Sequence, residues 1–168
     1  MKLAFQGELG AFSHLAATEF FPKSEIKTCQ TFEECFRLAI ENSEYKIIIP
    51  IENSLAGRVA DIHYLIPRYK LQIYAEYFHP VIHNLLGLKE AKLEDIKTVR
   101  SHSHAIGQCQ NIIQKNNLKP IISADTAGSA KYISEKKDKT ESAIASSLAA
   151  KIYDLQIIAK HAEDDSRN

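Results

Sequence analysis

Short apolar runs alternate with helical patterns of apolar residues along the chain. Lys2–Phe5 predicts a buried strand, and the residues after it that share one helical face include Leu15 and Phe20. This order of strand, polar junction and helix recurs about six times, which predicts an α/β fold with parallel strands. The predicted strands are 2–5, 46–50, 98–99, 120–122, 142–145 and 155–158.

The residues Thr31-Phe32-Glu33-Glu34 are typical of a capping box, in which Thr31 and Glu34 accept hydrogen bonds from each other's backbone amides. Apolar residues then recur at helical spacing. This pattern predicts a buried stripe made of Phe32, Cys35, Phe36, Ala39 and Ile40. Because Cys35 lies on the stripe, we interpret it as a core residue rather than a nucleophile.

The segment Ile47–Val59 ends an apolar strand in Glu52, Asn53 and Ser54, and a helical pattern that Pro67 stops begins there. The start of a helix has unpaired N–H groups and the positive end of the helix dipole, so it can hold an anion. The alternative is an ordinary helix cap, in which Asn53 or Ser54 satisfies only the helix's own N–H groups. Both interpretations are open at this point.

Two later segments, 71–74 and 77–88, are predicted to be extended. The second is long for a single strand and has Pro80 near its start. Such a strand is typical of a chain that crosses between two lobes.

The composition is that of an ordinary globular protein, with 45% apolar and 25% charged residues among 168. Lys plus Arg equal Asp plus Glu at 21 each, so the charge indicates neither a nucleic-acid partner nor an anionic membrane partner. The first residues lack the apolar core of a secretory signal and no run approaches the length of a membrane span, so a cytoplasmic location is expected. The three cysteines lack CxxC spacing and the seven histidines form no HExxH pattern, which argues against disulfides and against a metal site.

Polar or glycine-rich junctions follow the predicted strands, at the strand ends where open α/β sheets bind ligands. These junctions are Gly7–Ser13, Asn53–Ser54, Ser101–His102, Asp125–Thr126 and Ser146–Ser147. We also expect Gly57, Gly107 and Gly128 in the first turns of helices, where glycine costs about 1 kcal/mol relative to alanine. Close approach of a ligand or lobe would explain them, so a shared anion-binding cleft and a set of plain caps both stay open. The fingerprint GxGxxG is absent, so NAD binding is not supported.

Few reactive groups lie at these junctions. His102 follows Ser101 directly, but adjacent residues rarely form a working nucleophile–base pair, so Ser101 is expected to cap a helix or to bind substrate. Glu52 is a candidate general acid, and its alternative role is a structural ion pair. Asp125 is the other junction carboxylate, so a mechanism with two carboxylates has weak support.

Several segments together resemble the catalytic domain of prephenate dehydratases: FQGELGAFS, IPIENSLAGRV, SHSHAIGQC, and the pair ADTAGSA and IASSLAAKIYDL. The resemblance runs in order from Lys2 to Asn168, and its specific parts are the ENS-x-x-G-x-V and S-H-x-x-A-x-x-Q-C patterns. It implies two small α/β lobes with a cleft between them, similar to type II periplasmic binding proteins. By the resemblance, residues 1–77 plus 160–168 form lobe 1 and residues 78–159 form lobe 2.

The resemblance implies conversion of prephenate to phenylpyruvate, carbon dioxide and water in phenylalanine biosynthesis, with neither a metal nor an organic cofactor. Prephenate carries two carboxylates, which helix N-termini and hydroxyls can hold. Loss of the ring carboxylate and ring hydroxyl needs an acid near that hydroxyl and shielding from water. The expected substrate-binding residues are Gly10, Ser13, Glu52, Asn53, Ser54, Gly57, Ser101, His102, Gln108, Thr126 and Ala127.

The sequence departs from the family pattern after Glu163–Asn168, where a Thr-Arg-Phe motif with a catalytic threonine is expected. The 168 residues contain neither this motif nor a phenylalanine-sensing regulatory (ACT) domain. We therefore expect this polypeptide to have little dehydratase activity, and the alternative is a binding protein of the same fold for a small carboxylate or amino acid. A third reading is a generic α/β domain whose junctions are only caps. The resemblance also suggests a homodimer, and the residues do not separate prephenate from arogenate as substrate.

Overall fold

The computed structural model describes residues 1–165 and 167, and it contains two compact units. The first unit comprises residues 1–8 and 12–80, and the second comprises residues 9–11 together with the chain from residue 81 onward. The predicted lobe boundary after residue 77 lies near this division. In contrast to the predicted lobes, residues 160–165 pack with the second unit, and residues 166 and 168 of that predicted segment lie outside the described residues.

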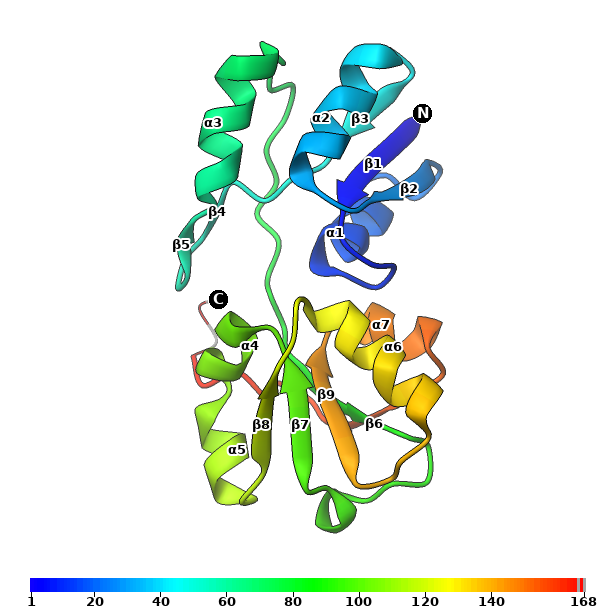
Figure 1. Cartoon of the computed structure of the whole chain (residues 1–168), viewed down its shortest axis with the longest axis vertical. Helices are drawn as coiled ribbons and strands as arrows, with labels where there is room; N and C mark the ends of the chain where they lie inside the picture. Colours follow the sequence, from blue (N-terminus) through cyan, green and yellow to red (C-terminus); the bar gives the residue numbers. More distant parts are fainter. Residues whose placement is uncertain (166, 168) are drawn as a thin grey trace. The chain divides into compact units, whose positions relative to one another are not determined.

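The first unit is built on a three-stranded parallel sheet with the order β2-β1-β3 (Figure 1). The central strand β1 matches the predicted first strand, and its residues Leu3, Ala4 and Phe5 are fully buried. The elements of this unit are β1 (Lys2–Gln6), α1 (Phe12–Phe20), β2 (Glu25–Cys29), α2 (Phe32–Glu41), β3 (Tyr45–Ile47), β4 (Glu52–Asn53), β5 (Gly57–Arg58) and α3 (Ala60–Tyr69).

Helix α2 begins at the predicted cap. The Thr31 hydroxyl accepts a hydrogen bond from the Glu34 amide at 3.1 Å, whereas the Glu34 carboxylate accepts from the Gln30 amide at 2.6 Å, one residue before the predicted partner. Phe36 is buried with residues of α3, and burial of such a side chain contributes about 1.5–3 kcal/mol. Ile40 is 55% exposed, so the buried stripe is narrower than predicted.

The predicted helix start at Glu52–Ser54 is wrong. Residues 52–58 form the two-stranded antiparallel hairpin β4–β5, and α3 begins only at Ala60. Pro67 lies inside α3 rather than ending it, and the helix ends at Lys70 in a left-handed conformation. The apolar spacing is helical throughout this region, so the spacing alone does not distinguish the hairpin from an additional turn of helix.

The second unit is built on a mixed five-stranded sheet with the order β10-β6-β9-β7-β8. Strand β7 is parallel to β8 and β9, whereas β6 is antiparallel to both of its neighbours. The prediction of parallel strands is therefore wrong for β6. The elements of this unit are β6 (Asn84–Gly87), the 3-10 helix η1 (Leu93–Asp95), β7 (Thr98–Ser101), α4 (Ser103–Gln108), α5 (Gln110–Lys115), β8 (Lys119–Ile122), α6 (Thr126–Lys136), β9 (Glu141–Ala145), α7 (Ser147–Ile152) and β10 (Gln156–Ala159).

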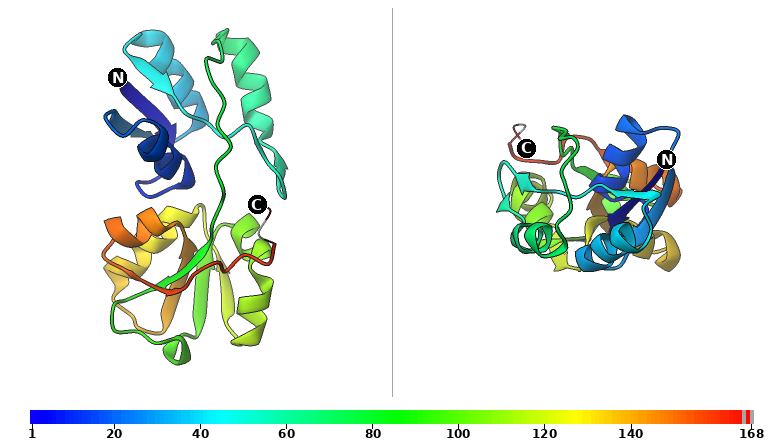
Figure 2. Two further views of the ribbon diagram at one scale, coloured as in Figure 1. Left: turned by 180° about the vertical axis from the view of Figure 1, so that it is seen from behind. Right: turned by 90° about the horizontal axis from the view of Figure 1, so that it is seen from above.

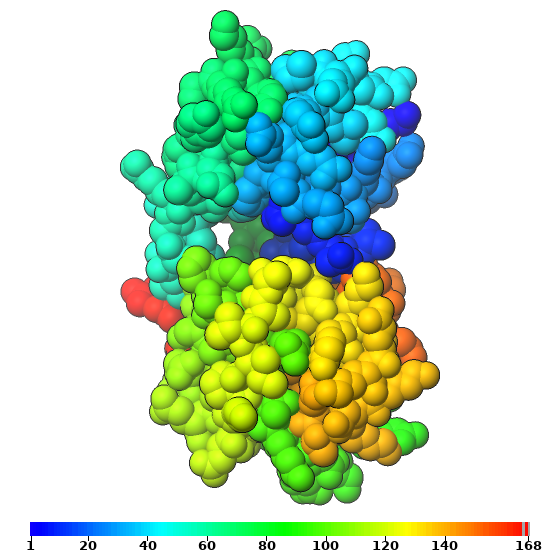
Figure 3. All heavy atoms as spheres, viewed as in Figure 1, coloured from blue at the N-terminus to red at the C-terminus, as the bar shows by residue number. Residues whose placement is uncertain are grey.

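Helices cover both faces of this sheet. Ile144 of β9 packs in one core cluster with residues of α4 and α5, and its neighbours Ala143 and Ala145 pack in another with residues of α6 and α7. The residues of α6 and the loop after it form much of the visible surface on one side of this unit (Figure 3). Both faces of the inner strands β6 and β9 are therefore buried, as their apolar runs predict, whereas the edge strand β8 is largely exposed.

The segment 71–83 contains neither helix nor strand, and the extended pattern predicted for 77–88 forms a strand only at β6. Tyr77 stacks on Phe20 with 4.2 Å between ring centroids. Tyr74 and Phe78, by contrast, are 78% and 90% exposed. No helix among the described residues is long and apolar enough to cross a membrane.

The three cysteines are free thiols in the cores of the two units. Cys35 is fully buried, which confirms its predicted role as a core residue. Burial raises the pKa of the Cys29 and Cys35 thiols, and it raises that of Cys109 to about 12. A thiol that stays protonated is a poor nucleophile, so these side chains act in packing.

Candidate functional site

Three helices of the second unit begin at the same edge of its sheet. Strands β7, β8 and β9 are parallel, so their carboxyl ends meet at this edge, and α4, α6 and α7 start just after them. We call this edge, with the residues His102, Asp125 and Ser146 that cap the three helices, the strand-end edge. Each helix start directs backbone N–H groups toward this edge, which makes it suitable for binding negative charge.

The three capping side chains differ in chemistry. His102 Nδ1 accepts a hydrogen bond from the His104 amide at 3.2 Å, Asp125 accepts from the Gly128 amide at 2.6 Å, and Ser146 Oγ accepts from the Ala149 amide at 3.0 Å. The cap interpretation is therefore confirmed for the junctions at Asp125 and Ser146. At the Ser101–His102 junction, the cap is the histidine rather than the serine.

Ser101 forms a side-chain hydrogen bond within the sheet of the second unit. Its side chain is fully buried and its hydroxyl donates a hydrogen bond to the Ile144 carbonyl of β9 at 2.6 Å. Because His102 Nδ1 instead faces the His104 amide, Ser101 and His102 do not form a nucleophile–base pair. Ser101 thus fixes the strand that carries His102.

The surroundings of His102 favour the neutral form of its imidazole ring. Burial lowers its pKa, the neighbouring His104 lowers the pKa further, and the carboxylate of Asp125 opposes these effects. His104 lies edge-on to His102 with 4.9 Å between ring centroids. Since Nδ1 of the neutral ring accepts a hydrogen bond, its proton is on Nε2, which can donate to an oxygen of a ligand.

Thr126 and Ala127 are the first two residues of α6. Thr126 is half-buried and Ala127 is fully buried. Gly128 follows them, and a Cβ atom at this position would lie 2.7 Å from Oδ2 of Asp125. The glycine therefore makes room for the capping carboxylate, which is a sufficient reason for it without a ligand. A ligand is therefore not needed to explain a glycine at this position.

Gly10 lies beside the cap of α7. Its backbone has a φ of +92°, and its carbonyl accepts a hydrogen bond from Ser146 Oγ at 2.5 Å. Gly10 thus lies at the strand-end edge with His102, Thr126 and Ala127.

Gln108 ends α4 and contacts both His83 and the segment that follows β10. Its side-chain oxygen lies 2.9 Å from His83 Nε2, and its carbonyl accepts from the Asp164 amide at 2.7 Å. The segment that follows β10 runs across the second unit to reach this place (Figure 2). Gln108 therefore helps to hold this segment.

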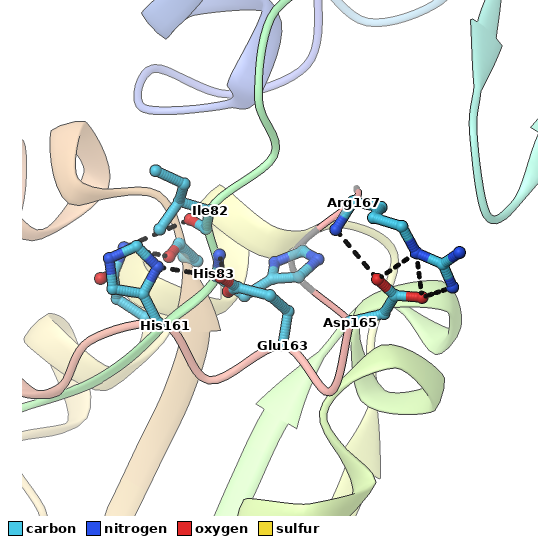
Figure 4. Close-up of polar contacts among 8 residues, drawn as sticks. Ile82, His83, His161, Glu163, Asp165 and Arg167 are labelled. Atoms are coloured by element: carbon cyan, nitrogen blue, oxygen red, sulfur yellow. Dashed lines mark hydrogen bonds and ion pairs between the residues drawn. The ribbon is translucent and has the colours of Figure 1, made fainter.

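Glu163 is the centre of the contacts around His83 (Figure 4). Its carboxylate accepts from the His83 amide at 2.8 Å and lies 3.1 Å from His161 Nδ1, while its side chain is 4% exposed. Burial lowers the pKa of His83, whereas Gln108 and Glu163 raise it. The sequence shows only an acidic stretch here, because the partners of Glu163 include a residue about eighty positions earlier.

A separate hollow of about 340 Å³ lies along α5. Its lining includes Ile112 and Lys115 of α5 and the stretch His161–Asp164. Asp164 is already bound, because its carboxylate accepts from the Gln110 and Asn111 amides at 2.8 and 2.9 Å. None of the predicted substrate-binding residues lines this hollow.

The remaining predicted site residues belong to the first unit. Asn53 closes the β4–β5 hairpin, where its side-chain oxygen accepts from the Leu55 and Ala56 amides at 3.0 and 2.7 Å. Gly57 of the same hairpin has a φ of +81°, which favours glycine, so it is not in a helical turn as predicted.

The hairpin also carries Glu52 and Ser54, both of which are exposed, whereas Ser13 is half-buried in the first turn of α1. The first unit thus holds Glu52, Asn53, Ser54 and Gly57 together on one hairpin, with Ser13 on a different element.

A family model for prephenate dehydratase matches residues 3–168 of the chain. The chain belongs to the prephenate dehydratase family. This family comprises prephenate and arogenate dehydratases, which are carbon–oxygen lyases, and the predicted family resemblance is confirmed.

Curated relatives match nearly the whole chain. The bifunctional N-acyl-homoserine lactone acylase/prephenate dehydratase of Komagataeibacter europaeus is 38% identical over 99% of this chain and 59% of its own length. Arogenate dehydratase/prephenate dehydratase 1 of Arabidopsis thaliana is 39% identical over 100% of this chain and 43% of its own length. The chain thus spans about half the length of these relatives.

Solved structures share the fold. The structure titled GqqA, a novel type of quorum quenching acylase, has a TM-score of 0.90 at 38% identity, covering 98% of this chain and 60% of its own. Prephenate dehydratase from Arthrobacter aurescens in complex with L-Phe has a TM-score of 0.91 at 24% identity, covering 100% of this chain and 57% of its own. The α/β fold predicted from the sequence is confirmed by these likenesses.

Proposed function

We propose that these 168 residues form the substrate-binding part of a prephenate or arogenate dehydratase. The observation that carries the proposal is the family match over residues 3–168. The strand-end edge supports it, because three helix starts meet there and such starts favour carboxylates. Prephenate and arogenate both carry a carboxylate on the ring and another on the side chain.

The proposed reaction removes the ring carboxylate as carbon dioxide and the ring hydroxyl as water. The electron pair of the breaking C–C bond forms the aromatic ring as the C–O bond breaks, and the leaving oxygen takes a proton. His102 and Thr126 would bind and orient an oxygen of the substrate, His102 through its Nε2 proton. The hairpin residues Asn53 and Ser54 and the predicted cleft between two lobes remain part of this proposal.

We further propose that the 168 residues alone bind substrate but turn it over slowly, because they contain no Thr-Arg-Phe motif. Calorimetry with prephenate and arogenate measures binding, and the absorbance of phenylpyruvate measures prephenate turnover. Binding with weak turnover is the expected result. Turnover at a rate typical of enzymes would refute the second proposal, and failure to bind either compound would refute the first.

A variant pair sharpens the test. His102→Ala should weaken binding about tenfold, because it removes a hydrogen bond to a charged oxygen. His63→Ala is the matched control, since His63 is exposed on α3 in the first unit. Equal affinities of the two variants would contradict the role of His102. Closure around an amino acid without chemistry would instead favour the binding-protein alternative.

A further inference from the structure

The loop between β1 and α1 packs as part of the second unit, although the residues on either side of it belong to the first. Its residues Leu9 and Gly10 contact α7 and the residues at its two ends. The Leu9 carbonyl accepts a hydrogen bond from the Tyr153 hydroxyl at 2.8 Å, and the Gly10 carbonyl accepts one from Ser146 Oγ at 2.5 Å. Two consecutive carbonyls of the loop are therefore held by side chains at the two ends of one short helix.

Gly10 makes the contact close. A Cβ atom at Gly10 would lie 2.7 Å from Cα and 2.9 Å from Cβ of Ala149, and its φ of +92° is a conformation that other residues rarely adopt. The clash is with backbone in the first turn of α7, so it cannot be relieved by turning a side chain. The loop backbone thus lies directly against the helix, and glycine is required there.

Ser146 serves both elements through one hydroxyl. The oxygen accepts from the Ala149 amide, which caps α7, and the single proton is donated to the Gly10 carbonyl. Ser146 is fully buried, so water does not compete for either bond. Tyr153 reaches the loop from the other end of α7, where its backbone amide donates to the Ala149 carbonyl and its hydroxyl donates to the Leu9 carbonyl. The hydroxyl bond can be removed by Tyr153→Phe, which leaves the backbone cap and the ring in place.

We propose that Ser146 and Tyr153 are positioning residues that hold Leu9–Ala11 in one place at the strand-end edge for substrate binding. The inference rests on the proposed function, because it treats this edge as the place where the substrate binds. Neither residue needs to touch the substrate. They act by ordering the loop backbone before the substrate arrives. Without them, the loop would lose conformational entropy on binding, which would weaken the affinity.

The test compares Tyr153→Phe with Tyr64→Phe. Both variants remove one phenolic hydroxyl, and Tyr64 is exposed on α3, away from this loop in the chain. Amide hydrogen exchange of Leu9–Ala11 measures how firmly the loop is held. Tyr153→Phe should speed this exchange and weaken prephenate binding, each by about two- to tenfold, which is the range for one hydrogen bond. The thermal midpoint of the second unit should fall by no more than about 4 °C, because only one hydrogen bond is lost.

The outcomes separate this proposal from the proposed function. Unchanged exchange in Tyr153→Phe overturns the positioning role, and faster exchange with unchanged affinity overturns its effect on the substrate. If the unaltered chain binds neither prephenate nor arogenate, the proposed function fails, while hydrogen exchange still decides whether Tyr153 holds the loop. Ser146→Ala should speed exchange more than Tyr153→Phe, and it should also lower the stability of α7, because the cap is lost as well.

Discussion

Replacing Gly107 by alanine should stabilise the second unit. Gly107 is the fifth of the six residues of α4, so the prediction that it lies in the first turn is wrong. It is exposed, and a Cβ atom added there would meet no atom within 4 Å. Alanine is about 1 kcal/mol better than glycine in a helix interior, so the free energy of unfolding should rise by about 0.5–1 kcal/mol. For a chain of this size, that change raises the thermal midpoint by about 2–4 °C.

Gly128→Ala is the matched comparison, since it makes the same change in α6. The new Cβ would lie 2.7 Å from the capping carboxylate of Asp125, so the cap must shift and about 0.5–2 kcal/mol of its contribution is at risk. We therefore expect no stabilisation, or a net loss, at this position. Urea unfolding of the two variants beside the unaltered chain measures both effects.

The result that would refute the reasoning is a Gly107→Ala variant less stable than the unaltered chain. A third outcome is informative about the site. If Gly107→Ala is more stable but binds prephenate less tightly, then the open space at this glycine is where the substrate approaches, as the sequence pattern led us to expect.

Two further predictions concern the contacts around Gln108. Burial holds the pKa of His83 below its usual value. As the pH falls through about 6.5, the unfolded chain therefore takes up a proton at His83 before the folded chain does. The free energy of unfolding should decrease until the pH reaches the lower pKa of the folded state. Unfolding free energies at pH 7.5 and 5.5 check this, and a slope that His83→Gln leaves unchanged would contradict it. Asp164→Ala should cost about 1–2 kcal/mol, because two amides of α5 lose their acceptor. A loss no larger than that of Glu135→Ala, at an exposed position of α6, would argue against it.

Much of the fold follows from local patterns. The buried strands β1 and β9 are largely apolar or small-residue runs, and the Asp125 cap is followed by a helix as expected. The direction of β6 was not predictable, because an apolar run has the same pattern in a parallel and an antiparallel strand. Asn53 also has two possible uses, since it can cap a helix or close a hairpin, and the structure shows the hairpin.

The sequence predicts where the candidate site residues lie along the chain, but it does not predict their hydrogen-bond partners. The sequence places Ser101 at a strand end, yet only the paired strands show that its hydroxyl is committed to Ile144. Glu163 and Asp164 look like a solvated acidic stretch, and their partners lie far away in the sequence. Local patterns cannot contain such pairings, so the network that holds this segment required the structure.

The burial of all three cysteines has a practical consequence for spectroscopy. Cys29, Cys35 and Cys109 are each at most 1% exposed, and burial raises the pKa of each thiol. A maleimide dye should therefore leave the native chain nearly unlabelled near neutral pH. One introduced cysteine on each unit, for example at exposed His63 and exposed Lys115, would then carry a donor and acceptor dye without removal of the native thiols. Energy transfer between the dyes would report how the separation of the units responds to prephenate.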